Sequence, residues 1–493
     1  MVTLEERVKM QMKRIIACLL ALVCLLLSFA AAEEAVVPNT QLPKPKFMKN
    51  VAVHDPSIIK ADDGYYYIYG SHMAAAKSAD LIDWEYISRD ATNAGCTLVE
   101  NVQTQMAEAL KYAKTTTFWA PDVVQLANGT YVMYYCTCEG SSPLSTLGIA
   151  YADKPEGPYV DQGIILKSGY SGYNANNYPN VVDPCTFYDK DGRLWMVYGS
   201  YSGGIYILEM DLETGFPLEG QSTFGKKLLG GNHSRIEAPY IMYSPETDYY
   251  YLFLSFGGLA ANDGYNIRVC RSKTPDGPYE DALGQNMIKC KGRAGTFFND
   301  PDYAPYGVKL MGGYVFQVED GDKNRFTPIA YRSPGHNSCY YDEETGRYFI
   351  VFHTRFANSG ESFQVRVHQM YMNAEGWPVV SPLRYAGERP ETVDGSLQPG
   401  VYKVLLHERD INTVEHKSQL ITLNEDGTVT GDLTGTWACT DGVNVTLTLE
   451  GHTYTGVMHT ALDASQKTWA TCISALDETG ASLWALRAYI NYK

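Results

Sequence analysis

Short runs of aromatic and β-branched residues recur along most of the chain, and a polar turn precedes each of them. The runs are Tyr65–Tyr69, Tyr131–Tyr135, Leu194–Tyr198, Tyr249–Leu254 and Tyr348–Phe352. Turn signals such as Asp63-Gly64 and Asn128-Gly129 stand just before them. The runs are too short for helices and are rich in residues that favour strands. We therefore predict that each run is a buried strand bounded by turns.

A second pattern precedes these strands: a polar or aromatic residue, usually followed by proline, recurs five times. The phrases are His54-Asp55-Pro56-Ser57, Trp119-Ala120-Pro121-Asp122, Val182-Asp183-Pro184-Cys185, Ile236-Glu237-Ala238-Pro239 and Gly335-His336-Asn337-Ser338. Periodic blocks with several short strands predict an all-β fold, a five-bladed β-propeller whose first strands line a central channel. We expect the leading residues of the phrases to converge on one centre. They are Asp55, Trp119, Asp183, Glu237 and His336.

The repeat ends near Gly387-Glu388-Arg389-Pro390, which predicts a domain boundary. The propeller then spans residues 45–387, and residues 395–493 form a second domain. Short alternating stretches such as Val443–Leu449, separated by turns such as Asn424–Gly427, predict a small β-barrel or sandwich there. We expect this domain to carry no catalytic residue.

The N-terminus predicts secretion. Three basic residues between Lys9 and Arg14 precede an apolar run over residues 15–29, and Ala30-Ala31-Ala32 follows it. A basic start, an apolar stretch and a small-residue cleavage site are typical of a signal peptide, here residues 1–32. A retained membrane anchor is the alternative, but the run is short for a membrane span. We expect a secreted, extracellular protein that does not associate with membranes after the signal peptide is removed.

The charge balance bears on possible partners. The 493 residues carry a formal net charge of −16 at pH 7, and 19% of them are charged. Nucleic-acid binding requires clustered Lys and Arg, so the composition argues against a nucleic-acid partner. It also disfavours adhesion to anionic membranes. Acidic charge on a secreted protein is consistent with solubility alone.

The cysteines do not indicate a disulfide framework. Eleven are present, and Cys18 and Cys24 lie in the predicted signal peptide, which leaves an odd number at irregular spacing. Cys136 and Cys138 alternate on one predicted strand, so their side chains point the same way and we expect no bridge between them. Whether Cys439 and Cys472 pair stays open. The spacing of Cys and His does not indicate a zinc site.

The five phrases together resemble glycoside hydrolase family 43, and within it the endo-1,5-α-L-arabinanases that carry an extra C-terminal β-domain. The likeness covers roughly residues 45–490, and all five phrases occur in order. It implies a glycoside hydrolase that cleaves internal α-1,5-L-arabinofuranosidic bonds of arabinan with inversion. The implied partner is plant cell-wall polysaccharide, the arabinan side chains of pectin.

Inverting glycosidases use two carboxyl groups, about 6.5–9.5 Å apart, one as acid and one as base for a water molecule. The resemblance assigns Asp55 as the general base, Glu237 as the general acid and Asp183 as a third carboxylate that orients the acid and tunes its pKa. Clustered carboxylates raise the pKa of at least one member, which keeps an acid protonated near neutral pH. An Asp before proline is by itself most often a turn residue, and a buried structural carboxylate is the alternative for Glu237.

Residues near the same positions offer contacts for a sugar. The indole of Trp119 can stack on a sugar ring, with plain core packing as the alternative. Asn180, Ser200 and Ser202 flank the inner strand of the third blade and offer hydrogen bonds to sugar hydroxyls, with simple turn roles as the alternative. Gly140 lies in the loop after the second blade's inner strand, where we expect a wall of the cleft.

His336 differs from the other leading residues. A lone histidine is usually a packed or hydrogen-bonded residue, and Ca²⁺ prefers oxygen ligands. The resemblance implies instead one Ca²⁺ ion in the central channel, held through a histidine and waters, which assigns the metal site to His336. His353, on the following strand, is the competing candidate.

Two alternative functions stay open. An α-L-arabinofuranosidase or a β-xylosidase of the same family would share the three carboxylates and differ in the shape of the cleft. A non-catalytic glycan-binding propeller is the alternative of another class, but it would be expected to lack a carboxylate, and here all three are present.

Overall fold

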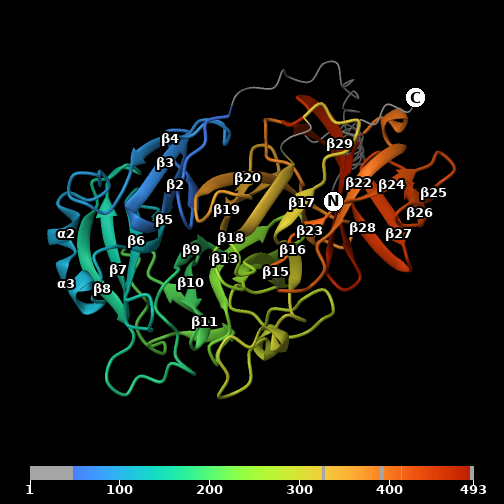
Figure 1. Cartoon of the computed structure of the whole chain (residues 1–493). Coiled ribbons are helices and arrows are strands. Elements are labelled where there is room, and N and C mark those ends of the chain that lie inside the picture. Colours follow the sequence, from blue (N-terminus) through green and yellow to red (C-terminus); the bar gives the residue numbers. More distant parts are fainter. Residues whose placement is uncertain (1–47, 325–327, 389–392, 412, 489–493) are drawn as a thin grey trace, which may run out of the picture. The chain divides into compact units, whose positions relative to one another are not determined.

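The computed structural model describes residues 48–324, 328–388, 393–411 and 413–488. The predicted signal peptide lies outside these residues. The described chain folds into five sheets and one closed barrel, and the colours of Figure 1 follow them in sequence order. In the described part of the chain, no helix has the length and apolar character needed to cross a membrane.

The first four sheets are four-stranded and antiparallel, and their strands follow chain order. Blade 1 contains β1 (Ser57–Lys60), β2 (Tyr66–Gly70), β3 (Ala74–Ser78) and β4 (Glu85–Ser88). Blade 2 contains β5 (Trp119–Gln125), β6 (Tyr131–Cys138), β7 (Ser145–Ala152) and β8 (Val160–Lys167). Blade 3 contains β9 (Cys185–Tyr188), β10 (Leu194–Ser200), β11 (Gly204–Met210) and β12 (Lys226–Leu229). Blade 4 contains β13 (Ile236–Ser244), β14 (Tyr249–Phe256), β15 (Asn266–Ser272) and β16 (Val308–Met311).

The fifth sheet has six strands in the order β21-β20-β19-β18-β17-β23. Its members are β17 (Tyr314–Phe316), β18 (Ile329–Asp342), β19 (Arg347–Arg355), β20 (Phe363–Met372), β21 (Pro378–Val380) and β23 (His416–Lys417). The short strand β23 comes from the chain between two barrel strands and pairs in parallel with β17. The predicted five-bladed propeller is confirmed, with an additional strand that the sequence pattern did not indicate.

The C-terminal strands close into a barrel, which decides between the predicted barrel and sandwich. They are β22 (Gly400–Leu406), β24 (Gln419–Leu423), β25 (Thr428–Gly431), β26 (Gly435–Cys439), β27 (Asn444–Leu449), β28 (His452–Asp463), β29 (Thr468–Asp477) and β30 (Ser482–Arg487). Closure removes the exposed edges that an open sheet would leave.

Short helices connect the strands. They are α2 (Val102–Gln105), α3 (Ala107–Tyr112), η2 (Ser71–Met73), η3 (Met287–Lys289), η4 (Asp300–Asp302) and η5 (Gly395–Leu397), where η marks a 3-10 turn. The turn η2 joins β2 to β3 and carries Ser71 and His72. A longer excursion between β15 and β16 contains η3 and η4.

Apolar packing between neighbouring blades closes the propeller ring. Ile68 and Trp84 of the first blade region share one buried cluster with Phe349 and Val367 of the fifth. These blades are far apart in the sequence, so the cluster joins the two ends of the propeller. Each apolar side chain of this size contributes about 1.5–3 kcal/mol when fully buried.

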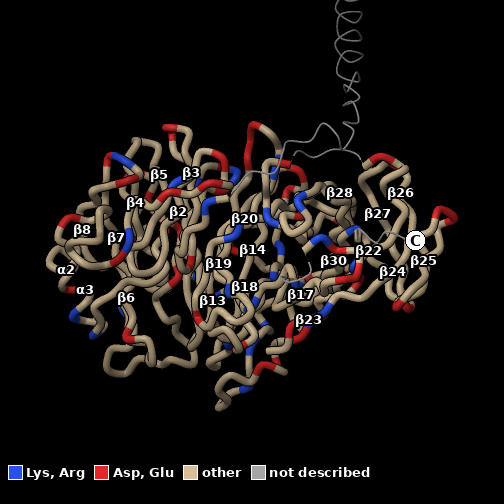
Figure 2. The backbone as a smooth tube through the Cα atoms, turned by 45° about the horizontal axis from the view of Figure 1, so that its top comes forward, with Lys and Arg blue, Asp and Glu red and all other residues tan. Residues whose placement is uncertain are grey.

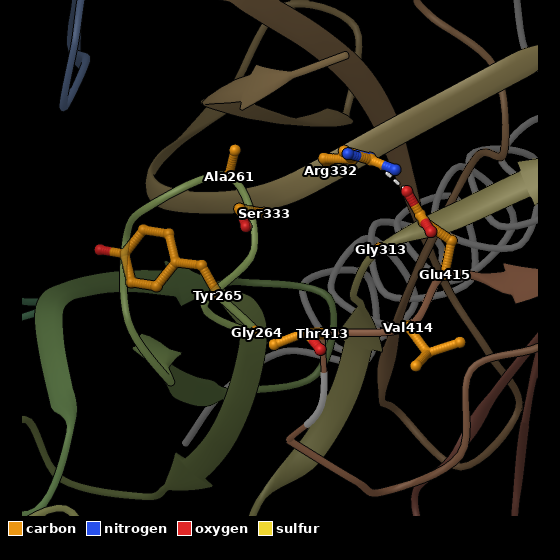
Figure 3. Close-up of a pocket in the computed structure, with 9 residues that line it drawn as sticks. All are labelled: Ala261, Gly264, Tyr265, Gly313, Arg332, Ser333, Thr413, Val414 and Glu415. Atoms are coloured by element: carbon orange, nitrogen blue, oxygen red, sulfur yellow. Dashed lines mark hydrogen bonds and ion pairs between the residues drawn. The ribbon is translucent and has the colours of Figure 1, made fainter. Parts of the chain in front are cut away.

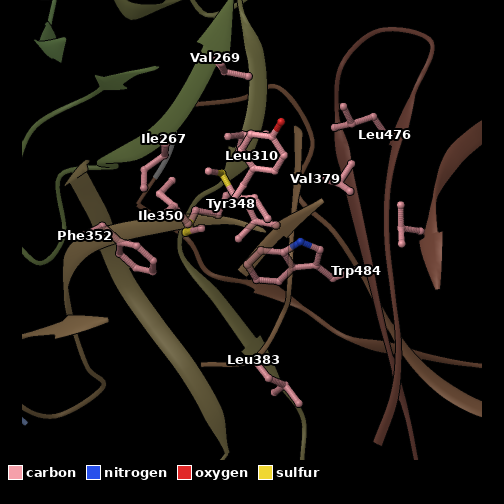
Figure 4. Close-up of a cluster of buried hydrophobic side chains, with 14 of the residues drawn as sticks. Ile267, Val269, Leu310, Tyr348, Ile350, Phe352, Val379, Leu383, Leu476 and Trp484 are labelled. Carbon is pink, nitrogen blue, oxygen red and sulfur yellow. The ribbon is translucent and has the colours of Figure 1, made fainter. Parts of the chain in front are cut away.

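The barrel packs against blades 4 and 5 through a second buried cluster, which Figure 4 shows around Trp484. The indole of Trp484 lies edge-on to Tyr314 at 5.1 Å between ring centroids. The Ser482 hydroxyl donates a 2.7 Å hydrogen bond to the carbonyl of Lys309. The C-terminal domain therefore shares a core with the propeller.

Asp122, the last residue of the second phrase, ties three blades together. The carboxylate is buried and accepts hydrogen bonds from the Ser57 hydroxyl of β1 and from the Thr186 backbone N–H of β9, at 2.7 Å for the latter. Burial raises the pKa of Asp122 to about 6, although these hydrogen bonds act in the opposite direction. The residue fixes the first strands of neighbouring blades relative to one another.

The cysteines of the described chain are free, including Cys136, Cys138, Cys439 and Cys472. The expectation that Cys136 and Cys138 do not pair is confirmed, and the open question about Cys439 and Cys472 is answered against a bridge. Figure 2 shows acidic residues at many outer turns with Lys and Arg dispersed among them.

Candidate active site

Each blade has the same unusual backbone at one residue within or just before the strand that carries its repeated phrase. One residue there has a positive φ although it is not glycine, a strained conformation that is typical of functional sites. These residues are Asp55 (56°), Ala120 (31°), Asp183 (56°), Ala238 (55°) and His336 (45°). The predicted equivalence is therefore correct for Asp55, Asp183 and His336. It is wrong by one residue for Trp119 and Glu237, because an alanine occupies the equivalent position in those two blades.

The strand pairing places Glu237 at the last paired position before a bulge. Glu237 pairs with Ser255 in β14, and the register then shifts before the next pair, Tyr240 with Phe253. The same shift follows Trp119 in β5. Such bulges re-aim side chains at the edge of an active site. The bulge brings Glu237 to the carboxylate of Asp183, which accepts a 3.2 Å hydrogen bond from the next backbone N–H, that of Ala238.

Asp55 is a buried carboxylate among imidazoles. Its Oδ1 lies 3.0 Å from Nδ1 of His336, and its Oδ2 lies 2.8 Å from Nδ1 of His54. The Ser71 hydroxyl also donates to Oδ2. Burial acts to raise the pKa of Asp55, but His336 and His54 outweigh it and hold the pKa well below its usual range. Asp55 is consequently ionised at neutral pH, as a general base must be.

Glu237 is equally buried but has hydroxyl partners. The Tyr265 hydroxyl donates to Oε1 and the Ser200 hydroxyl donates to Oε2, both at 2.9 Å. Burial raises the pKa of Glu237, and the negative charge of Asp55 adds to the rise, while His336 and the two hydroxyls act against it. A raised pKa keeps a carboxylic acid protonated at the pH where it must give up a proton.

Asp183 is close enough to both carboxyl groups for them to affect its pKa. Burial is the largest cause that raises its pKa to about 7, and the negative charges of Glu237 and Asp55 contribute to the rise against the opposing effect of His336. A proton on such a pair of neighbouring carboxylates belongs to both. The three environments push the pKa values apart, which assigns Asp55 to the ionised form and the Asp183–Glu237 pair to the proton-carrying form.

The two substrate contacts predicted in blade 2 are Trp119, at the start of β5, and Gly140, in the turn after β6. Trp119 is half-buried, contacts Cys138 and Val182, and its ring lies 4.9 Å from His72 in an edge-on arrangement. Gly140 is exposed in the turn after β6, with a φ of 93° and open space around its Cα. Blade 2 therefore offers a partly exposed indole at Trp119 and an open turn at Gly140.

The predicted polar contacts in blade 3 differ in position. The Ser200 hydroxyl donates to Glu237. Asn180 uses its side-chain oxygen to accept a 2.5 Å hydrogen bond from the Ser145 hydroxyl. Ser202 is buried, and its carbonyl accepts a 3.1 Å hydrogen bond from the backbone N–H of His233. Of these three residues, the structure brings Ser200 into contact with one of the buried carboxyl groups, that of Glu237.

Sequence reasoning missed Tyr265, Ser71 and His54. Tyr265 stands in the loop before β15, where the repeated phrase gives no signal, although it donates to Glu237. Ser71 links two blades, because its hydroxyl oxygen also accepts a 2.9 Å hydrogen bond from the backbone N–H of Ala120. His54 is part of the first phrase, so only its adjacency to Asp55 could have drawn attention to it.

A small pocket lies behind Tyr265, and Figure 3 shows the tyrosine pointing away from it. Its far side comes from the segment that leaves the barrel, where Glu415 forms an ion pair with Arg332 of β18. The ring of Tyr265 packs so closely on Gly335 that an added Cβ atom there would lie 2.0 Å from it. Glycine before His336 is therefore required by the position of Tyr265.

Two regions of the chain match known protein families. Residues 48–301 match the glycosyl hydrolases family 43, and residues 382–485 match a C-terminal lipocalin-like domain that accompanies it, GH43_C. The chain is 50% identical over 455 residues to extracellular endo-α-(1→5)-L-arabinanase 2 of Bacillus subtilis (strain 168), covering 91% of this chain and 95% of that protein. The chain belongs to glycosyl hydrolase family 43. It is a glycoside hydrolase.

Solved structures of family 43 agree with the fold described here. The family 43 YxiA protein from Bacillus licheniformis has a TM-score of 0.86 and 52% identity, covering 90% of this chain and 99% of that one. The endo-1,5-α-L-arabinanase from Thermotoga petrophila RKU-1 has a TM-score of 0.85 and 45% identity, covering 90% and 100%. Both likenesses extend over the propeller and the barrel.

The two histidines considered for a metal have different surroundings in this family 43 chain. His353 is fully buried, stacks on His54 at 4.0 Å between centroids, and its Nδ1 accepts a 3.2 Å hydrogen bond from the backbone N–H of Asp55. A possible metal-binding group in the described chain joins these three residues and does not include His336. Nδ1 of His336 forms an ion pair with Asp55. Nε2 of His336 has no hydrogen-bond partner in the described part of the chain.

Proposed function

We propose that the protein is an extracellular endo-α-1,5-L-arabinanase that cleaves internal bonds of arabinan with inversion. The observation that carries the proposal is the buried triad of Asp55, Asp183 and Glu237, in which one carboxyl group is held ionised and the others are held toward the protonated form. Relatives at 50% and 45% identity bear the name extracellular endo-α-(1→5)-L-arabinanase and match most of the chain.

In the proposed mechanism Glu237 protonates the glycosidic oxygen of the leaving group. Asp55 removes a proton from a water molecule that attacks the anomeric carbon from the opposite face, so the configuration inverts. The strong suppression of the Asp55 pKa keeps this base charged as the pH falls. The Tyr265 and Ser200 hydroxyls hold the two oxygens of Glu237 and so fix the direction of its proton.

Asp183 positions and tunes the acid. It shares one proton and the remaining negative charge with Glu237. The backbone N–H of Ala238, next to Glu237, donates a hydrogen bond to its carboxylate. Negative charge on Asp183 disfavours ionisation of Glu237 and so raises its pKa. Glu237 therefore keeps its proton until the leaving group takes it. It has no separate chemical step in the mechanism.

The contacts proposed for the sugar chain are Trp119 as a stacking face, Gly140 as part of the cleft wall, and Asn180, Ser200 and Ser202 as polar contacts. Trp119 is half-buried, so one part of its indole remains open for stacking. Ser200 also serves Glu237, so its substitution should alter both substrate binding and the acid.

Calcium is proposed as the resident ion, with His336 as its protein ligand. A metal-binding histidine usually donates its other ring N–H to a carboxylate, and His336 has this arrangement with Asp55. Asp55 is also the main cause that raises the pKa of His336 to about 9 against the effect of burial, so binding through Nε2 must displace a proton. When bound, the ion would supply positive charge near the carboxylates.

The proposed substrate in its natural setting is the arabinan of plant cell walls, including the side chains of pectin. The signal peptide proposed for residues 1–32 would deliver the enzyme to this polymer. An exo-acting arabinofuranosidase is the second candidate, since a relative at 26% identity is named extracellular exo-α-(1→5)-L-arabinofuranosidase ArbA.

Product analysis separates these candidates. Linear debranched arabinan and xylan are each digested with the purified enzyme, and the products are resolved by chromatography at early times. The proposal predicts arabino-oligosaccharides of mixed length from arabinan and no products from xylan, with Glu237→Ala as the inactive control. Arabinose as the sole early product would indicate exo action, and xylose products would indicate a β-xylosidase.

A further inference from the structure

Two neighbouring phenylalanines are exposed in the excursion between β15 and β16. Phe297 is 68% exposed and Phe298 is 51% exposed. Burial of a phenylalanine side chain is worth about 1.5–3 kcal/mol, so a folded chain loses stabilisation by leaving two together in water. Single exposed apolar residues are common, whereas a grouped and ordered pair marks a binding surface.

The rings are held in place by other aromatic residues. Phe297 stacks on His233 with 4.1 Å between ring centroids and 15° between the planes. Phe298 lies 5.6 Å from the ring of Tyr201 and 6.2 Å from Phe297. The exposed faces are therefore positioned before any ligand arrives, which reduces the entropy lost on binding.

The backbone at the same place is strained. Phe298 has a φ of 52° and His233 a φ of 56°, in the left-handed region that bulky residues rarely adopt. The Phe298 N–H donates a 3.3 Å hydrogen bond to the carbonyl of His233, which joins the two segments. Strain of this kind persists where the surrounding structure fixes it, and it is typical of ligand-binding sites.

Ion pairs anchor the excursion beneath the rings. Arg235 pairs with Asp300, and its second branch lies 2.8 Å from Asp263. Arg293 pairs with Asp302 at 3.2 Å. The charged groups thus hold the segment, while its apolar rings remain in solvent.

The surface is continuous with the catalytic acid. β10 ends at Ser200, which donates to Glu237, and the chain passes directly into Tyr201. His233 stands three residues before the start of β13, the strand that carries Glu237. The rings therefore contact residues next to the strands of blades 3 and 4 that carry Ser200 and Glu237, whereas Asp55 enters from blade 1.

We propose that Phe297, backed by the stacked ring of His233, and the perpendicular Phe298 form an aromatic platform that binds furanose rings of the arabinan chain on the leaving-group side of the scissile bond. The proposal rests on the proposed arabinanase function. The polymer is neutral, so its sugar rings offer C–H faces to aromatic faces, and no charged partner is needed. Glu237 protonates the leaving oxygen, so a surface on the acid's side meets the departing part of the chain.

The test compares Phe297→Ala with the wild type on two substrates. On linear debranched arabinan we expect KM to rise about threefold to tenfold with kcat nearly unchanged, as expected for the loss of one aromatic contact. An aryl α-1,5-arabinotrioside places its sugars on the other side of the scissile bond, so its kcat/KM should stay at the wild-type value. Phe297→Tyr, which keeps the flat face, should restore the KM for arabinan.

Phe216→Ala is the matched control. Phe216 is also an exposed phenylalanine, at 36%, but it follows β11, which runs away from the end of β10 that carries Ser200. This variant should behave like the wild type on both substrates. Thermal melting of each variant establishes that the fold is intact, and Phe297 does not have the positive φ of Phe298, so its substitution leaves the strained backbone unchanged.

Three results would overturn the platform. If the wild type is active and Phe297→Ala has an unchanged KM for arabinan, the platform is ruled out. The proposed arabinanase function is then unaffected. An equal loss on the aryl trioside would show a general effect on the active site instead of a leaving-group contact. A wild type that is inactive on arabinan would reject the proposed function itself, and the platform with it.

Discussion

Nδ1 of His336 lies 3.0 Å from Oδ1 of Asp55, so the proposed metal ligand and the proposed base are in direct contact. The contact lowers the pKa of Asp55 and raises that of His336. A change at either residue should therefore alter the other. This coupling is the physical reason to expect that loss of an ion from His336 would affect catalysis as well as stability.

The first prediction follows from that coupling. Stripping divalent ions with a chelator should lower both activity and the melting temperature, and added Ca²⁺ should restore both through binding linkage. His336→Ala should weaken this rescue far more than His353→Ala, because His353 is packed against His54 and already accepts a backbone hydrogen bond.

The measurements are elemental analysis of the purified protein, activity, and thermal melting with and without chelator. His353→Ala serves as the control for damage to the same buried cluster. If the purified wild type holds no divalent ion and the chelator has no effect, His336 is not a metal ligand. It is then a packed histidine of the channel.

The second prediction concerns Glu237. Glu237→Ala should reduce hydrolysis of arabinan by at least ~10²–10⁴-fold, the typical contribution of a general acid. A substrate with a good leaving group needs little protonation, so its rate should fall much less. Steady-state kinetics on arabinan and on an aryl arabinofuranoside measure both effects. Equal losses on the two substrates would argue against Glu237 as the acid.

The third prediction concerns Tyr265. Its hydroxyl donates to Glu237 and favours the ionised carboxylate, so it lowers the pKa of the acid. Tyr265→Phe removes that donor and should raise the pKa of Glu237. The enzyme loses activity on the basic side when the acid loses its proton, so the basic limb of the kcat/KM profile should move to higher pH. A purely structural role would lower activity without moving the limb.

Ser200→Ala offers a parallel test of the same effect. The Ser200 hydroxyl donates to the other oxygen of Glu237, and it too lowers the pKa of the acid. The basic limb should therefore shift in the same direction. A shift to lower pH in either variant would contradict the assigned roles of the two hydroxyls.

The repeated phrase predicted much of this site because blade repetition fixes where each first strand begins. Five blades and the convergence of Asp55, Asp183 and His336 followed from it. The one-residue offset of Glu237 was overlooked, although the proline marks it: Pro239 follows Ala238, whereas Pro56 and Pro184 directly follow Asp55 and Asp183. Tyr265 was missed because it reaches the acid from an irregular loop.

The sequence likewise predicted the structure of the barrel domain only in part. Its alternating strands were evident, but closure into a barrel and the addition of β23 to blade 5 depend on pairings between distant segments. The buried cluster around Trp484 arises from the same long-range contacts. Local sequence pattern carries no information on which distant strand a segment pairs with.

The stereochemistry of hydrolysis distinguishes a base at Asp55 from a nucleophile at the same residue. If Asp55 activates water while Glu237 donates the proton, the first-formed sugar must have the inverted anomeric configuration. Proton NMR of the reducing end, recorded in the first minutes of arabinan hydrolysis before mutarotation, measures this. The proposed mechanism predicts a β-anomeric signal that appears first and then equilibrates. An initial α-anomeric signal would mean retention, and it would make Asp55 a nucleophile and contradict the proposed mechanism.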